Sequence, residues 1–302
     1  MARGDAPTRC GFVALLGAPN AGKSTLLNTL IGAKVSIVTH KVQTTRTRIT
    51  GVCVVGRSQL IFTDTPGIFE PRRRLDRAMV AAAWSGAADA DLQAVLIDAK
   101  KGAGADCWRI VEGLKDRKNK AVLILNKIDL VKRENLLMLA DKLNDSGVFT
   151  DIFMISALKG DGVDDLRDFF AAHVPNGPWH YPPDQLTDIT ERLLAAEITR
   201  EKLYLRLHQE LPYLSTVETE SWEGRKDGSV RIGQVIYVER AGQRGIVLGK
   251  QGQTIKQIGA DARAEMEQLF GRKVHLFLFV KVRERWADDP ERYREMGLGF
   301  IE

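Results

Sequence analysis

Residues 11–24 read GFVALLGAPNAGKS, and this stretch fixes the architecture of the first half of the chain. Its first six residues form a short apolar run that is typical of a buried strand. The next eight have the spacing G-x-x-x-x-G-K-S and lead into an apolar-periodic segment that predicts a helix over 23–31. A strand, a glycine-rich loop and a helix in this order present backbone N–H groups and a helix N-terminus to phosphate. The sequence therefore predicts a phosphate-binding α/β domain.

The loop assigns a role to several of its residues. Gly17 and Gly22 let the backbone curl toward phosphate oxygens, Lys23 is expected to reach the β- and γ-phosphates, and the Ser24 hydroxyl is expected to ligate Mg²⁺. The nucleotide-binding residues predicted in this loop are Gly17, Ala18, Pro19, Asn20, Ala21, Gly22, Lys23, Ser24 and Thr25.

The rest of 10–174 alternates short aliphatic runs with longer amphipathic stretches. This pattern predicts a doubly wound, mostly parallel sheet with helices on both faces. The expected strands are 11–16, 51–55, 59–63, 92–97, 121–125 and 152–155. The expected helices are 23–31, 75–86, 106–117, 134–144 and 163–173.

Three further motifs follow strands of this predicted sheet. They are Asp64-Thr65-Pro66-Gly67, Asn126-Lys127-Ile128-Asp129 and Ser156-Ala157-Leu158. Each lies at the carboxyl end of a strand, where open α/β sheets bind ligands. A carboxylate such as that of Asp64 holds Mg²⁺ through water, and the Gly67 N–H is placed to meet a γ-phosphate. All of these residues except Ile128 are predicted to bind nucleotide.

Asp129 is expected to select the base. One carboxylate accepts both N–H donors on the edge of guanine, whereas adenine has no amine there, and a buried acceptor left unpaired rejects the wrong base. The motif set resembles the signature of a translation-factor-class P-loop GTPase. The resemblance implies GTP and GDP as ligands, Mg²⁺ as cofactor, and catalytic roles for Lys23, Thr45, Asp64 and Gly67.

The segment Gln43-Thr44-Thr45-Arg46-Thr47 lies where such GTPases place a switch threonine that ligates Mg²⁺ and senses the γ-phosphate. Thr45 is our first choice and Thr44 the second, and a polar strand edge is the alternative.

The residue after Gly67 is Ile68, where Ras-type switches use a glutamine to orient water. We therefore expect slow unstimulated hydrolysis.

Two features of this half keep alternatives open. Asn20 resembles the asparagine of potassium-activated GTPases, in which K⁺ takes the place of an arginine finger, but asparagine is also common in turns. Arg72, Arg73 and Arg74 are either a solvated face or a patch that touches RNA.

The composition excludes several classes of protein. Of 302 residues, 44% are hydrophobic and 27% charged, which excludes a disordered or low-complexity chain. Apolar runs such as 121–125 are too short for a membrane-spanning helix of about 20 residues. The N-terminus has no secretory signal pattern, so we expect a cytoplasmic location. Cys10, Cys53 and Cys107 are odd in number and widely spaced, which argues against a disulfide framework or a zinc site.

A proline-rich stretch, 175–183, marks a domain boundary. We predict a GTP-binding domain over 1–174, a linker over 175–185 and a second domain with a C-terminal tail over 186–302. Its expected elements follow the order α-β-β-α-α-β. They are a helix over 188–208 that begins with an Asp188/Glu191 capping box, strands over 216–222 and 230–239, helical segments over 244–248 and 254–270, and a strand over 273–282.

The second domain carries the loop Gly249-Lys250-Gln251-Gly252 between two helical segments. The KH module clamps nucleotides with such a G-x-x-G loop, and in this setting the domain resembles a type II KH domain. We expect Ile246, Val247, Ile255 and Ile258 to form an aliphatic groove for the bases. The predicted RNA-binding residues are Arg244, Ile246, Val247, Gly249, Lys250, Gln251, Gly252 and Lys256.

Net charge does not mark this domain as basic. The chain carries +5, of which 1–180 contribute +6 and 181–302 contribute −1. Basic residues nevertheless concentrate in 231–256 and in 272–285, each with a net charge of +4. Such local clusters are sufficient for phosphate contact.

Taken together, the motifs of both domains resemble the bacterial Era GTPase family over almost the whole chain. The resemblance implies a factor that binds the 3′ end of 16S rRNA, joins the 30S subunit during maturation and associates peripherally with the inner membrane. The oligomeric state is open, with a monomer as the default. Two rivals are a protein in which GTP is only a structural ligand, and a GTPase of tRNA modification or membrane signalling. The KH-like domain argues against the second rival.

Overall fold

The computed structural model describes residues 7–41, 44–46, 48–115, 120–207 and 211–300. The chain divides into two compact units. The first unit comprises Met1–Ser36, Thr45–Asp188 and Met296–Glu302, and the second comprises Ile37–Thr44 and Ile189–Glu295. Within the described residues, no helix combines the length and the apolar character needed to cross a membrane.

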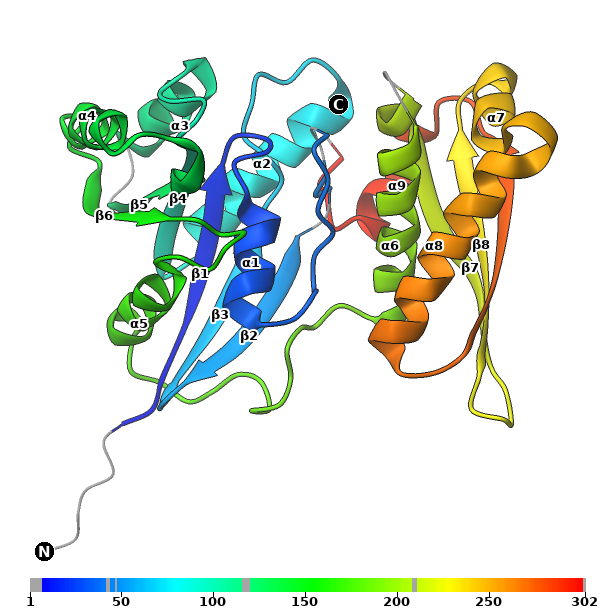
Figure 1. The fold of residues 1–302 in the computed structure, drawn as a ribbon, viewed down its shortest axis with the longest axis horizontal. Coiled ribbons are helices and arrows are strands. Elements are labelled where there is room, and N and C mark those ends of the chain that lie inside the picture. The colour runs from blue at the N-terminus through cyan, green and yellow to red at the C-terminus, as the bar shows by residue number, and fades with distance from the viewer. Residues whose placement is uncertain (1–6, 42–43, 47, 116–119, 208–210, 301–302) are drawn as a thin grey trace, which may run out of the picture. The chain divides into compact units, whose positions relative to one another are not determined.

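A six-stranded sheet with the order β2-β3-β1-β4-β5-β6 forms the centre of the first unit (Figure 1). Only β2 runs antiparallel to its neighbour, so the predicted doubly wound, mostly parallel sheet is confirmed. The strands are β1 (Arg9–Gly17), β2 (Ile49–Val55), β3 (Ser58–Asp64), β4 (Leu92–Asp98), β5 (Ala121–Asn126) and β6 (Phe149–Ile155). The helices are α1 (Lys23–Ile31), α2 (Arg74–Ala88), α3 (Ala105–Lys115), α4 (Arg133–Asn144) and α5 (Val163–His173), with a 3₁₀ turn η1 (Ile128–Leu130).

Side-chain alternation along β1 explains why both faces of this sheet are covered. Val13 and Leu15 join a buried cluster with residues of α1 and α5. Ala14 and Leu16 point to the opposite face and join a second cluster with residues of α2, α3 and α4. Because β1, β3, β4, β5 and β6 run parallel, their carboxyl ends meet at one edge of the sheet, and the loops that carry the motifs gather there.

The second unit has the predicted α-β-β-α-α-β order (Figure 1). Its three-stranded sheet pairs β7 with β8 antiparallel and β8 with β9 parallel. Residues of α6, α7 and α8 pack with these strands in two apolar clusters. The elements are α6 (Glu191–Arg206), η2 (Leu211–Leu214), β7 (Ser215–Gly224), β8 (Val230–Val238), α7 (Ala241–Leu248), η3 (Lys250–Gly252), α8 (Gln253–Phe270), β9 (Val274–Val282), η4 (Trp286–Asp288) and α9 (Pro290–Glu295).

The start of α6 differs from the prediction. The helix begins at Glu191, and its N-cap is Thr190, whose hydroxyl accepts the Leu193 N–H at 3.3 Å. Asp188 instead accepts a hydrogen bond from the Tyr181 hydroxyl at 3.4 Å. The predicted capping box is therefore wrong, because a threonine in extended conformation directly before the helix supplies the cap.

The proline-rich stretch is hydrogen-bonded to strands of the first unit. Gln59 is fully buried, its Oε1 accepts the N–H groups of His180 and Tyr181, and its Nε2 donates to the Tyr181 carbonyl. Farther along, the Thr187 hydroxyl donates to the Thr50 carbonyl at 2.6 Å. The division into units accordingly falls after Asp188, beyond the predicted linker 175–185. It also groups the last residues of the chain with the first unit instead of the second.

Candidate functional site

The phosphate loop joins β1 to α1 as predicted. Gly22 has φ +103°, and a Cβ built there would lie 2.2 Å from Asn126 Nδ2, so only glycine fits this close approach. Lys23 is buried, and its ammonium donates to the carbonyls of Gly17 and Ala18 at 3.0 and 3.2 Å. Burial lowers the pKa of Lys23 to about 8, although Asp64 opposes this shift. A buried ammonium in this position favours an anionic ligand.

Asp64 gathers the residues of the predicted magnesium site. Its Oδ2 accepts hydrogen bonds from the hydroxyls of Ser24 at 2.6 Å, Ser36 at 2.9 Å and Thr45 at 3.0 Å. The Ser24 and Thr45 hydroxyls lie 3.1 Å apart. Burial raises the pKa of Asp64, while Lys23 and the three hydroxyls lower it.

The donor set of this cluster fits Mg²⁺. Asp64 is fully buried, and among the described residues its Oδ1 has no hydrogen-bond partner. One carboxylate and two neighbouring hydroxyls are hard oxygen ligands, and Mg²⁺ is held by few protein ligands together with water and phosphate. In the part of the chain that the structure describes, no cluster of three His, Cys, Asp or Glu side chains offers a rival metal site.

The geometry favours Thr45 over Thr44 as the switch threonine. The Thr44 hydroxyl is turned to Thr39 Oγ1 and the Lys41 carbonyl, both at 2.7 Å, and not to Asp64. Gln43 and Thr47 lie outside the described residues. Sequence reasoning missed Ser36, because a lone serine in a loop gives no signal until the fold brings it to Asp64.

Asn126 ties three of the predicted loops together. Its Nδ2 donates to the Ala21 carbonyl at 2.8 Å. Its Oδ1 accepts the N–H of Lys127 at 2.8 Å and that of Ala157 at 3.0 Å. One buried amide therefore fixes the phosphate loop, its own loop and the loop after β6 against one another.

Replacing Asn126 with alanine should destabilise the protein markedly. The change leaves the buried Ala157 N–H and Ala21 carbonyl without this partner, and each such loss costs about 1–3 kcal/mol. We expect the free energy of unfolding in urea to fall by about 2–5 kcal/mol. An unfolding free energy within about 0.5 kcal/mol of wild type, the range of ordinary surface substitutions, would contradict this role.

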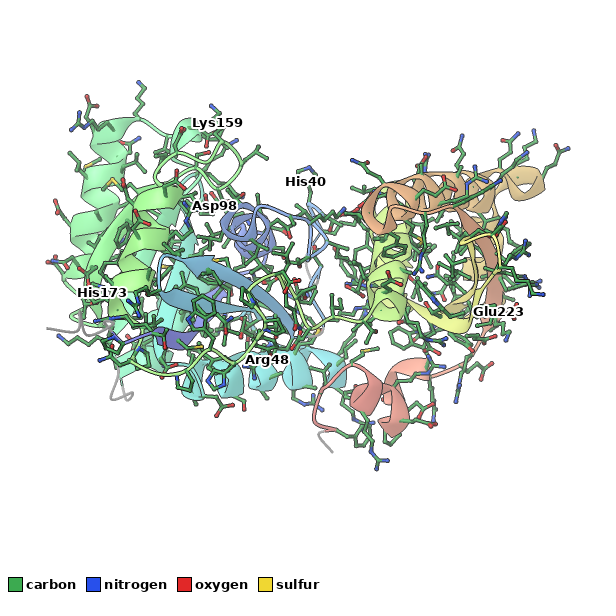
Figure 2. All side chains as sticks on the ribbon, turned by 90° about the horizontal axis from the view of Figure 1, so that it is seen from below. His40, Arg48, Asp98, Lys159, His173 and Glu223 are labelled. Carbon is green, nitrogen blue, oxygen red and sulfur yellow. The ribbon has the colours of Figure 1, made fainter. Side chains whose placement is uncertain are left out.

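Lys127 is held in an uncommon backbone conformation beside the phosphate loop. It has φ +66°, and its ammonium donates to the Asn20 carbonyl at 2.8 Å and to Asp98 Oδ2 at 2.6 Å. Asp98, labelled in Figure 2, is the last residue of β4 and lies opposite Asn126 at the end of the parallel strand β5. We did not predict Asp98, although a carboxylate at the end of a buried strand was a usable signal. Asn20 also has a positive φ, +64°.

Asp129 is prepared as a hydrogen-bond acceptor. The Ser156 hydroxyl donates to its Oδ1 at 2.8 Å, and Lys159 Nζ lies 3.6 Å from its Oδ2. The Ser156 hydrogen bond lowers the pKa of Asp129 most, with a further contribution from Lys159. Leu158, in the loop after β6, is 83% exposed. An ionised carboxylate held in this way suits the two N–H donors of guanine.

The segment after β3 offers no side chain to orient water at position 68. Ile68 is fully buried in the cluster formed with α2, α3 and α4 residues, and its N–H donates to the Gly17 carbonyl at 3.1 Å. Farther on, Arg72 and Arg73 are exposed, and their backbone N–H groups donate to Asp76 at the start of α2.

The G-x-x-G loop lies between α7 and α8. Gly249 has φ +72°, and a Cβ built there would lie 2.1 Å from Thr254 Oγ1, so the loop packs tightly on the first turn of α8. Gln251 has φ +52°, which is strained for a residue with a side chain and is a feature of functional loops. Lys250, Gln251, Lys256 and Arg244 are exposed.

The predicted aliphatic groove is only partly available. Val247 and Ile258 are fully buried in the apolar cluster of the second unit, so their side chains cannot face bases. This corrects our expectation for both residues, because the helices turn these positions toward the sheet. Ile246 is 58% exposed, and Ile255 is partly buried against the same cluster. The apolar contact to a ligand is thus left to Ile246 and Ile255.

The two basic segments differ in how their charges are paired. In 272–285, Arg272, Lys281 and Arg283 form ion pairs with Glu191, Glu220 and Asp289. In 231–256, no described acidic residue pairs with Arg244, Lys250 or Lys256, the cations around the G-x-x-G loop. Phosphate contact is therefore expected chiefly from the segment that contains the loop.

Comparison with protein families and relatives covers both units. Residues 12–127 match the family of 50S ribosome-binding GTPases, and residues 210–287 match the KH domain family. The GTPase Era of Rhizobium meliloti is 62% identical over 299 residues, which cover 99% of this chain and 96% of that protein. The GTPase Era of Brucella suis is also 62% identical, over 293 residues, with 97% and 94% covered.

Solved structures give the same result for the fold. A crystal structure of Era in complex with MgGDPNP and nucleotides 1506–1542 of 16S ribosomal RNA is 38% identical, with a TM-score of 0.91. The similarity covers 96% of this chain and 99% of the Era chain in that structure. A crystal structure of a point variant of Aquifex aeolicus Era bound to GDP.AlF4- has the same identity, TM-score and coverage. The similarity thus spans both units.

Proposed function

The chain belongs to the Era GTPase family, and from this membership we propose that it is a GTP-hydrolysing switch that binds the 3′ end of 16S rRNA. We further propose that it acts on the 30S subunit during maturation. The observation that carries the RNA assignment is the match, over both units, to a relative crystallised with nucleotides 1506–1542 of that RNA. The exposed G-x-x-G loop with its cations supplies the matching surface in this chain.

The residues of the nucleotide site suit each part of GTP. Lys23 faces the phosphate cradle, Asp129 and Ser156 form the acceptor for guanine, and Ser24, Thr45 and Asp64 would hold Mg²⁺. When bound, the metal neutralises charge on the β- and γ-phosphates. The Gly67 N–H would meet the γ-phosphate. Because Ile68 is buried and apolar, unstimulated hydrolysis is slow, and a partner or ion supplies what a glutamine supplies elsewhere.

In cells, crosslinking of the protein to RNA followed by sequencing tests the RNA assignment. We expect a peak at the 3′ end of small-subunit rRNA. The family description for 12–127 names the 50S subunit, but it covers only the GTPase half, whereas the RNA-bound relative covers both units. A peak confined to 23S rRNA, or to tRNA, would contradict the proposal.

Reversing the charge of Lys250 should weaken RNA binding without unfolding the protein. Lys250 is exposed in the G-x-x-G loop, and replacing a phosphate-contacting cation lowers affinity and the salt slope. We expect Lys250→Glu to raise the Kd for a 3′-end RNA oligonucleotide about tenfold or more. The control is Lys226→Glu, the same charge reversal at another exposed lysine, in the turn between β7 and β8. Equal losses in both variants would show a general charge effect and not a loop contact.

We also propose that Asn20 helps to bind K⁺. Asn20 lies in the phosphate loop with a left-handed backbone, and its carbonyl is held by Lys127. If Asn20 helps to bind K⁺, GTP turnover is faster in K⁺ than in Na⁺ buffer, and Asn20→Ala removes the difference. Equal turnover of the wild type in both buffers would remove the idea.

The proposed location rests on the family resemblance, and a monomer is the default for the oligomeric state. We propose a cytoplasmic monomer that associates peripherally with the inner membrane. Fractionation of cells and sedimentation with vesicles of bacterial inner-membrane lipid test the location, and light scattering tests the mass. Absence from the membrane fraction and from sedimented vesicles would contradict the membrane proposal, and a dimer mass would contradict the monomer.

The rival in which GTP is only a structural ligand predicts no turnover. Multiple-turnover hydrolysis, accelerated by cognate RNA, would exclude it. A single burst without turnover would support it.

A further inference from the structure

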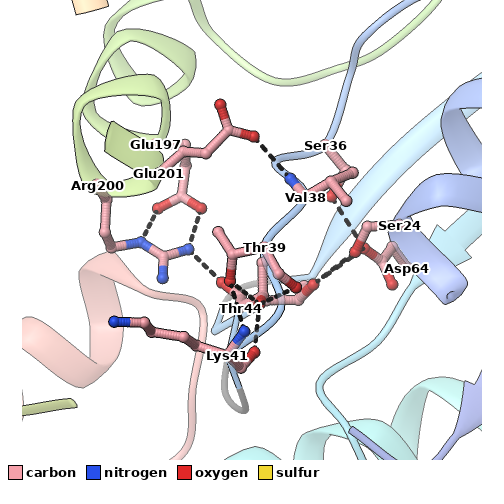
Figure 3. Close-up of polar contacts among 11 residues, drawn as sticks. Ser24, Ser36, Val38, Thr39, Lys41, Thr44, Asp64, Glu197, Arg200 and Glu201 are labelled. Carbon is pink, nitrogen blue, oxygen red and sulfur yellow. Dashed lines mark hydrogen bonds and ion pairs between the residues drawn. The ribbon is translucent and has the colours of Figure 1, made fainter. Parts of the chain in front are cut away.

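Described residues of the segment 37–44 form hydrogen bonds with α6 and with the residue after it, all within the second compact unit. At its start, the Val38 N–H donates to Glu201 Oε1 at 2.8 Å. At its end, the Thr44 carbonyl accepts a hydrogen bond from Arg200 Nη2. Between them, Lys41 Nζ donates to the Leu207 carbonyl, which follows the end of α6. Figure 3 draws the Val38–Glu201 and Thr44–Arg200 contacts, and 37–44 belongs to the same compact unit as α6.

The Arg200 side chain is fixed by a buried partner. Arg200 is 2% exposed and Glu197 is 7% exposed. Arg200 Nε donates to Glu197 Oε1 at 2.8 Å, and Nη2 donates to Glu197 Oε2. Burial alone would lower the pKa of Arg200, but Glu197 raises it above its ordinary value. The guanidinium thus stays charged, and its orientation is set by the carboxylate one turn earlier.

The residues that flank the segment are bound to Asp64. Ser36 precedes the segment, Thr45 follows it, and both hydroxyls donate to the same Asp64 oxygen. Within the segment, the Thr39 and Thr44 hydroxyls lie 2.7 Å apart, and Thr44 Oγ1 also donates to the Lys41 carbonyl. These hydrogen bonds join Thr44 to Thr39 and Lys41. The carbonyl of the Thr44–Thr45 peptide accepts the hydrogen bond from Arg200. The Thr45 side chain, which comes next, lies in the predicted metal site.

We infer that Arg200, oriented by Glu197, is a positioning residue for Thr45 in the GTP-bound state. The inference rests on the proposed function, because it takes Thr45 as a ligand of the Mg²⁺ that GTP brings. Release of Thr44 would leave a buried charged donor with one acceptor fewer, which is unfavourable. Arg200 therefore favours the conformation in which Thr45 reaches Asp64.

Because a switch threonine is ordered by the γ-phosphate and its metal, loss of its positioning should affect GTP and not GDP. Arg200→Lys keeps a cation beside Glu197 but lacks the planar fork that serves Glu197 and Thr44 together. We expect the Kd for Mg²⁺ and a non-hydrolysable GTP analogue to rise about tenfold, a coupling of ordinary size, while the Kd for GDP stays within about twofold of wild type. The matched control is Arg206→Lys, on the same helix, where Arg206 pairs with Asp261 on the exposed face. It should change neither value.

A double-variant cycle separates positioning from a general structural effect. If Arg200 acts through Thr45, then Arg200→Lys has no further effect on analogue binding in a Thr45→Ala background. If Arg200→Lys does not fold, Glu197→Gln combined with Arg200→Met removes both buried charges at once and should give the same selective loss.

Parallel changes in the affinities for analogue and GDP, additive effects in the cycle, or unchanged analogue binding by a folded Arg200 variant would each overturn the inference. Failure of the wild type to bind either guanine nucleotide would instead overturn the proposed function itself. The two failures are therefore distinguishable.

Discussion

Asp129→Asn should change the base preference of the protein from guanine to xanthine nucleotides. The carboxylate accepts two N–H donors from guanine, whereas an amide offers one donor and one acceptor. Xanthine carries a carbonyl in place of the exocyclic amine, so the amide matches it. Sites built on buried polar groups reject a mismatched ligand by about 10⁴-fold, and we expect the Kd for GTP to rise by about that factor.

Competition between labelled GDP and unlabelled GDP or XDP measures this change directly for wild type, and labelled XDP serves for the variant. Asp141→Asn, an equal loss of charge on the exposed side of α4, is the control and should bind as wild type does. The Ser156 hydroxyl that holds Asp129 can donate to an amide oxygen as well, so the loop should keep its position. Retained GTP preference in the variant would show that Asp129 does not read the base.

Asp64→Asn should abolish most GTP turnover while the protein stays folded. Asp64 is the acceptor for three hydroxyls, of which two belong to proposed metal ligands, and its other oxygen has no partner among the described residues. An amide keeps the shape but not the charge. Loss of one preorganised electrostatic group in an active site costs about 10²–10³ in kcat, and we expect a fall in kcat of at least about 10²-fold.

Turnover at saturating GTP, followed across a range of Mg²⁺ concentrations, measures the effect. The variant should also need more Mg²⁺ for half-maximal activity. Because burial of the ionised carboxylate raises the pKa of Asp64, neutralising it should not lower the free energy of unfolding through loss of charge. Turnover at the wild-type rate and Mg²⁺ dependence would remove Asp64 from the metal site.

The sequence was sufficient for the parts of the site that lie in continuous motifs. The segment 11–31 combines apolar periodicity with glycines at the spacing of a phosphate-binding loop. The structure has the strand, loop and helix that this pattern predicts. The loops after β3, β5 and β6 were placed at one edge because parallel strands must end together. The order of elements in the second domain was predicted in the same way, from segments whose apolar residues recur with the period of a helix or of a strand.

Features that depend on distant residues were harder to predict. Ser36 acquires its role only when folding brings it to Asp64, whereas Asp98, which pairs with Lys127, had a signal that we did not use. Gln59 gives no sign in the sequence that it will fix the backbone of residues 180 and 181, which lie more than a hundred positions later. Val247 was misjudged because an aliphatic side chain beside a functional loop serves the core and a ligand groove equally well until the helix orientation is known.

The bound nucleotide should control RNA binding through ordering of the Thr45 and Asp64 segments. The decisive measurement is the affinity of the protein for a fluorescent oligonucleotide from the 3′ end of 16S rRNA, first with Mg²⁺ and a non-hydrolysable GTP analogue and then with GDP. We predict a Kd about tenfold lower with the analogue, in the range of ordinary coupling between two sites. Equal Kd values in the two nucleotide states would contradict control of RNA binding by the nucleotide.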